Sequence, residues 1–69
     1  MASVVGQRGD GTFLVETDPV LERGHVVDID EGIVHPVNHV QSILARGYWD
    51  DVTDEVGAQR ALELVARNG

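Results

Sequence analysis

Two short runs of strand-forming residues, 3–6 and 12–16, flank a turn-forming segment at residues 7–11. Glycine tolerates positive φ and aspartate can bond to its own backbone, so this pattern predicts a β-hairpin. The apolar residues of the second run, 13–15, are consecutive rather than alternating with polar ones. Such a strand is either buried on both faces or partly covered by a neighbouring chain.

A further strand is predicted at residues 25–30, because apolar and polar positions alternate there. Val27 and Ile29 point to one face of such a strand, and Asp28 and Asp30 point to the other. One face of this strand is therefore expected to be buried and the other to be solvated.

The next apolar pattern predicts a helix at about residues 36–46. Pro36 suits the first helical position, where its missing N–H group is no loss, and Gly47 suits the left-handed position after the last turn. The apolar side chains of this segment recur at spacings of three and four residues and form one stripe: Val37, Val40, Ile43 and Leu44.

After this helix, residues 48–52 are expected to return as a short strand, and a second helix is expected at about residues 54–67. Glu63 and Arg67 are spaced for an i,i+4 ion pair on that helix. Carboxylates near the positive end of a helix favour its start, and three acidic residues have suitable positions: Asp51, Asp54 and Glu55.

These elements predict an α+β fold, with a small antiparallel sheet and one or two helices across one face. The sheet would combine the N-terminal hairpin with strands near 25–30 and 48–52. The helices would lie near 36–46 and 54–67.

The chain is expected to form one small domain over residues 1–69, in which residues 24–67 are the α/β body. Residues 1–18 are either a hairpin or an extended arm. A chain of this length buries only about 60% of its unfolded surface, so its core is expected to be small. The sequence has no cysteine, which excludes disulfides and leaves association with a partner as the expected stabilising device.

The composition is acidic, with twelve acidic residues against five basic ones and a net charge of −7. Nucleic acids and anionic membranes attract basic side chains, so neither is an expected partner. The chain shows neither the pattern of a signal peptide nor an apolar run of about 20 residues. We therefore expect a protein that is made in the cytoplasm and not secreted by a signal peptide.

The residues that could carry catalysis or bind metal have structural explanations. His35 and His39 have a spacing that two metal ligands can share on a helix, but Pro36 takes the place of the metalloprotease glutamate, and a third ligand would have to come from His25 or an aspartate. The acidic residues at 50–55 are explained by helix capping and a solvated surface. No nucleophile with an adjacent base and no phosphate-binding glycine loop is visible. We expect no catalytic, cofactor-binding or metal-binding residues, no cofactor, and no enzymatic activity.

Four residues are candidates for contact with a protein partner. Strand alternation sends Tyr48 and Trp49 to opposite faces, so one is expected to cover the first helix while the other faces outward. Tyrosine and tryptophan are enriched in binding hot spots, which makes the outward residue a natural anchor. Packing of both residues in the core is the alternative. Phe13 and Leu14 in the N-terminal hairpin form the second candidate patch.

The central segment contains an ordered set of residues that also marks a known group of proteins. It begins with Gly24 and Val27-Asp28-Ile29-Asp30, and continues with Val40, Ile43-Leu44-Ala45-Arg46-Gly47-Tyr48 and Val52. This order resembles a pattern in small structural-module proteins of tailed bacteriophages, the capsid accessory and head–tail proteins. In these proteins a strand of the type G-x-x-V-x-[VI]-[DE] precedes a helix that ends L-x-x-G-[YVW]. The resemblance covers about residues 24–52.

The resemblance implies a virion structural protein, first of all a minor capsid or decoration protein that binds neighbouring capsid subunits. It implies protein partners, many copies in a symmetric assembly, and no catalytic residues. The N-terminal segment would add a strand to a partner's sheet. Two alternatives remain: a head–tail connector accessory protein, and a small cytoplasmic antitoxin-like or inhibitor protein acting as a homodimer.

Overall fold

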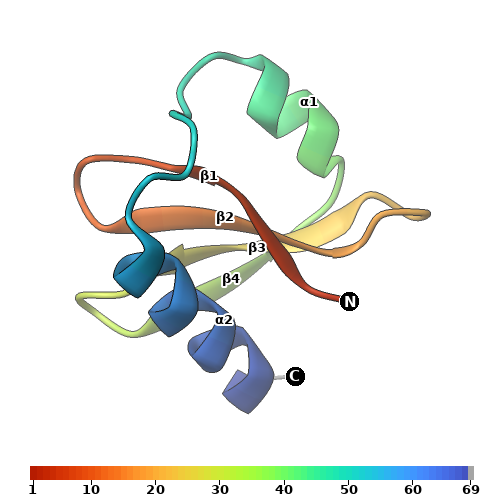
Figure 1. Cartoon of the computed structure of the whole chain (residues 1–69). Coiled ribbons are helices and arrows are strands. Elements are labelled where there is room, and N and C mark those ends of the chain that lie inside the picture. Colours follow the sequence, from red (N-terminus) through yellow and green to blue (C-terminus); the bar gives the residue numbers. More distant parts are fainter. Residues whose placement is uncertain (69) are drawn as a thin grey trace.

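The computed structural model describes residues 1–68, which form a four-stranded antiparallel sheet and two helices (Figure 1). The strands pair in chain order, so that each strand is joined to the next by a hairpin. This arrangement confirms the predicted α+β class. The elements are β1 (Ser3–Gln7), β2 (Thr12–Asp18), β3 (Arg23–Asp28), β4 (Ile33–Val37), α1 (Val40–Ala45) and α2 (Glu55–Asn68).

One face of the sheet is covered by α2, which lies across the strands (Figure 1). Phe13 on β2 is 2% exposed, and a Cβ atom added to Gly57 would lie 2.6 Å from its Cζ atom. Gly57 therefore allows the helix to approach the sheet closely, which offsets its low helix propensity. The buried cluster on this face contains Phe13, Val15, Val27, Ala58, Ala61, Leu64 and Val65.

The opposite face of the sheet carries Leu14, which is fully buried. Here α1 and the loop after it approach the strands at two glycines. A Cβ atom on Gly24 would collide with the β2 backbone and lie 2.8 Å from Cγ2 of Val40, and one on Gly6 would lie 3.0 Å from Cβ of Trp49. The consecutive apolar residues of β2 are therefore buried on both faces by the chain itself.

The first helix is shorter than predicted, and its expected start at Pro36 is wrong. Residues 33–37 form β4 and pair with β3 along their whole length. Pro36 is tolerated because β4 is an edge strand, where a missing N–H group need not interrupt the sheet. His39, with φ 59° and ψ 48°, then turns the chain into α1.

The third strand ends two residues earlier than the predicted range of 25–30. The cause is the carboxylate of Asp28, which accepts hydrogen bonds from the backbone N–H groups of Asp30 and Glu31 at 3.0 and 3.1 Å. These bonds close the turn into β4. The predicted alternation survives in part, since Val27 is fully buried.

The strand predicted at residues 48–52 is reduced to a single bridge, which is a correction to the expected sheet. Gln7 and Asp50 exchange two backbone hydrogen bonds, with N···O distances of 3.1 and 2.8 Å. Val52 then packs against the cluster under α2. This segment is therefore a loop fixed to the end of β1, and β4 takes its place as the fourth strand.

The start of α2 agrees with the helix predicted at 54–67. The Oδ1 atom of Asp54 accepts a hydrogen bond of 2.9 Å from the N–H group of Gly57. Such a cap satisfies one of the backbone donors that a helix leaves unpaired at its first turn. The expected capping role of Asp54 is confirmed.

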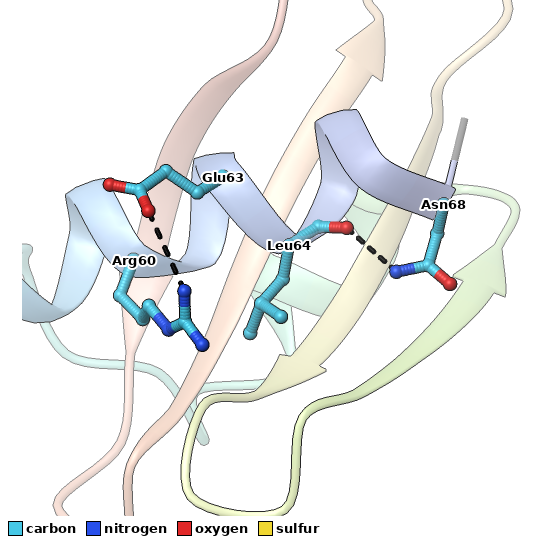
Figure 2. Close-up of polar contacts among 4 residues, drawn as sticks. All are labelled: Arg60, Glu63, Leu64 and Asn68. Carbon is cyan, nitrogen blue, oxygen red and sulfur yellow. Dashed lines mark hydrogen bonds and ion pairs between the residues drawn. The ribbon is translucent and has the colours of Figure 1, made fainter.

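The middle and the end of α2 carry one ion pair and one side-chain cap (Figure 2). The spacing predicted an ion pair between Glu63 and Arg67. In the structure Glu63 pairs with Arg60 instead, at 3.5 Å. Both side chains are exposed, so this pair contributes little to stability. Asn68 donates a hydrogen bond of 2.7 Å to the carbonyl oxygen of Leu64.

Candidate protein-interaction surface

The loop after α1 carries Tyr48 and Trp49 and is fixed at both ends. The helix stops at Gly47, whose φ of 81° lies in the left-handed region, as the sequence predicted. The backbone bridge between Gln7 and Asp50 holds the other end of the loop beside β1. The position of the two aromatic residues is therefore defined by the backbone on either side.

The two aromatic side chains differ in exposure. Tyr48 is 71% exposed, whereas Trp49 is half-buried and places its Cβ atom against Gly6 of β1. The sequence predicted one inward and one outward residue but did not decide between them. Tyr48 is the outward one.

Arg8 covers the ring of Trp49. Its guanidinium carbon lies 4.0 Å from the ring centroid, a cation–π contact worth about 0.5–1 kcal/mol at an exposed site. The backbone N–H group of Arg8 donates a hydrogen bond of 2.8 Å to the carbonyl oxygen of Thr12, which fixes the start of the β1–β2 turn. Sequence reasoning missed Arg8, because the contact joins distant parts of the chain and no local pattern marks it.

The indole N–H group of Trp49 is buried and has no hydrogen-bond acceptor among residues 1–68. An unpaired buried donor costs about 1–3 kcal/mol. Because this nitrogen is buried, a partner would meet the exposed atoms around it rather than the indole donor itself. We call Arg8, Tyr48 and Trp49 the aromatic patch.

The carboxylate of Asp10 lies in the turn that also carries Arg8. It accepts a hydrogen bond of 3.1 Å from the backbone N–H group of Thr12. Hydrogen bonding with the side chain and the backbone of Thr12 lowers the pKa of Asp10 below its usual value, and the positive charge of Arg8 lowers it further. Asp10 is therefore ionised at neutral pH, and the turn beside the patch carries charges of both signs.

The prediction that Phe13 and Leu14 form a second contact patch is wrong, because both residues are buried. Phe13 is 2% exposed beneath α2, and Leu14 is fully buried on the opposite face. Both side chains are used by the chain's own core, so they offer no surface to a partner. Of the four candidate contact residues, Trp49 is brought together with Arg8 and Tyr48 is its exposed neighbour in the loop. Phe13 and Leu14 are buried in the core.

The histidine and carboxylate candidates are not gathered into a site. His35 lies on β4 and His39 precedes α1, so they do not share a helix face. Among residues 1–68, no three histidine or carboxylate side chains are grouped to hold a metal ion. In the acidic segment, Asp54 caps α2, and the backbone of Asp50 forms the bridge to β1.

Comparison of the chain with protein-family models, with curated proteins and with solved structures gave no match. In the part of the chain that the structure describes, neither helix has the length and apolar character needed to cross a membrane. The function is therefore inferred from the residues of the chain and the chemistry of its surface.

Proposed function

We propose that this chain is a protein-binding structural module of a tailed bacteriophage particle, and that it serves as a minor capsid or decoration protein. The observation that carries the proposal is the aromatic patch, where Tyr48 is exposed beside the half-buried Trp49 and its covering Arg8. Tyrosine, tryptophan and arginine are the residues most enriched in binding hot spots. The patch thus joins all three on one fixed loop and the neighbouring turn.

Tyr48 is exposed, so its hydroxyl is a polar group of the patch that a partner can reach. A protein surface supplies hydrogen-bond acceptors for it in its backbone carbonyl groups. A negatively charged nucleic acid is a poorer fit, because the chain has a net charge of −7 and binding to phosphates depends on basic side chains.

The link to phage particles comes from the resemblance over residues 24–52, a segment that includes Tyr48 and Trp49 of the aromatic patch. Docking of many copies on a symmetric lattice would compensate for a small core, because binding stabilises only the folded state. Such a protein needs a rigid body and a contact surface, and no catalytic residues.

The direct test is quantitative mass spectrometry of purified particles from the phage or prophage that carries the gene. The proposal predicts a fixed, symmetric number of copies per particle. A protein that is absent from particles but abundant in the cytoplasm as a homodimer would contradict it and favour the antitoxin-like alternative.

A matched pair of variants then tests the patch itself. Tyr48→Ala is expected to weaken binding to the particle about thirtyfold, since a hot-spot residue contributes about 2 kcal/mol. Val56→Ala is the control, because Val56 is 84% exposed on α2 and is not part of the patch. Equal copy numbers for both variants would show that Tyr48 is not a contact.

A further inference from the structure

The hairpin between β2 and β3 projects from the molecule and has an apolar tip. Figure 1 shows this hairpin, in orange and yellow, extending beyond both helices at the end opposite the loop that follows α1. Val20 is 87% exposed and Leu21 is 55% exposed. Loop tips are usually polar, so two adjacent exposed aliphatic side chains at this position call for an explanation.

The tip is held in one conformation. The Oδ1 atom of Asp18 accepts hydrogen bonds of 3.1 Å from the backbone N–H groups of both Val20 and Leu21. Pro19, which lies between Asp18 and Val20, has a fixed φ. Glu22 adopts a left-handed φ of 54°, which is uncommon for a residue with a side chain. Because the tip is ordered before binding, a partner would lose little conformational entropy by receiving it.

The hairpin is also tied to the body of the protein. The carbonyl oxygen of Glu22 accepts a hydrogen bond of 3.0 Å from the N–H group of Val40, the first residue of α1. This bond fixes the last residue of the turn, one position after Leu21, to α1 while the two aliphatic side chains stay exposed. We call Val20 and Leu21 the wedge.

We propose that Val20 and Leu21 insert into an apolar pocket with a basic rim on a different protein. The carboxylates of Asp18 and Glu22 outnumber the one cation beside the tip, Arg23, and the chain as a whole carries −7. A second copy of the chain, or an anionic membrane, would bring like charge to this end, whereas a basic rim would be attracted.

The free edges of the sheet are weaker candidates for the same contact. β1 has an irregular register between Val4 and Gly6, and β4 contains Pro36. Bulges and prolines on edge strands discourage the addition of another strand. The N-terminal segment expected to pair with a partner is itself β1 of this sheet. The hairpin tip thus provides a second contact, which does not depend on the aromatic patch.

Site-specific photocrosslinking tests this inference in cells that assemble the native partners. The photoreactive residue p-benzoylphenylalanine replaces Val20 in one variant and Val56, the equally exposed control on α2, in another. The expected result is a crosslink from position 20 to one other protein, at a yield at least tenfold above position 56. The crosslinked peptide should be apolar with lysine or arginine within a few residues, and Leu21→Ser should lower the yield at least fivefold.

Three outcomes would overturn the inference: crosslinks from position 20 only to another copy of this chain, crosslinks only to lipid, or a yield no greater than that of position 56. Circular dichroism of each variant confirms folding, which should be unchanged because both side chains are exposed. A third probe at Tyr48 reports separately on the aromatic patch. Crosslinks at position 48 without any at position 20 would therefore reject the wedge and leave the proposed function standing.

Discussion

The two faces of the sheet are covered in different ways. On one face, α2 has 14 residues and buries five of them against the strands. On the other, α1 has six residues and buries only Val40, while the loop after it leaves Tyr48 exposed and Trp49 beneath Arg8. The first face is closed by side-chain packing, and the second is closed by a short helix that approaches the strands at two glycines.

This difference separates stability from recognition. Helices shorter than about 12 residues gain little stability on their own and depend on tertiary contacts. The α2 face supplies most of the apolar burial, so we expect it to dominate the free energy of unfolding. The α1 face has less apolar burial and therefore leaves hot-spot residue types on the surface.

The largest expected effect is that of Phe13→Ala on the α2 face. Removing this side chain is expected to cost about 3–5 kcal/mol, since the helix cannot collapse fully into the space. Leu14→Ala on the α1 face should cost less, about 2–3 kcal/mol, because a short helix adjusts more easily. Urea denaturation followed by circular dichroism measures both. A loss for Leu14→Ala that equals or exceeds that of Phe13→Ala would break the comparison.

Next in size is Gly24→Ala, which tests how α1 docks. The added methyl group would meet the β2 backbone and Val40, so a loss of about 1–3 kcal/mol is expected from overpacking. Gly9→Ala is the control, because no atom lies within 4 Å of a Cβ at Gly9. Amide chemical shifts should change mainly in α1 for the first variant. Equal stability of the two variants would mean that the close approach at Gly24 is unimportant.

A smaller loss is expected at the start of α2. Asp54→Ala removes the acceptor for the N–H group of Gly57 and should cost about 1 kcal/mol. Asp51→Ala changes the charge equally, at an exposed residue before the helix, and should stay within about 0.5 kcal/mol of the parent. Thermal denaturation of the pair separates the hydrogen bond from the charge.

The smallest effect concerns the β1–β2 turn, which belongs to neither face. The pKa of Asp10 is lowered from 3.8 in the folded chain, first by hydrogen bonding with Thr12. A depressed folded pKa means that the stabilisation is present above pH 3.8 and is lost as the pH falls through the folded value. Asp10→Asn should therefore lose slightly less stability than the parent as the pH is lowered from neutral to below 3.8. The denaturation midpoints of the variant and the parent are measured across this range. An equal fall of both midpoints with decreasing pH would contradict the prediction.

Much of the sheet could be predicted from local signals, and β4 could not. The β-hairpin, β3 and α2 follow from turn residues, alternation and the cap at Asp54. From residue 36 the local signals favoured a helix, because Pro36 suits a helix start, and they gave residues 33–35 no element. Pairing with β3 overrode that preference, and a hydrogen-bonded register between strands is not visible in a single segment.

Only part of the aromatic patch could be predicted, again because one of its contacts forms between distant segments of the chain. Tyr48 and Trp49 are adjacent, so alternation alone placed them on opposite sides. Arg8 reaches Trp49 only through the folded sheet, which no local spacing encodes. Phe13 and Leu14 were open to two interpretations, because a strand buried by its own chain and one buried by a neighbour have the same apolar run.

The hydrogen bond between Glu22 and Val40 has a mechanical consequence. It joins the turn between β2 and β3 to the first residue of α1, and α1 leads directly into the loop that bears Tyr48. A pull on this turn would reach that loop along this route, in addition to acting through β2 and β3 on the cluster beneath α2. The amide of Val40 is therefore the place where hydrogen exchange should register tension between the turn and the loop.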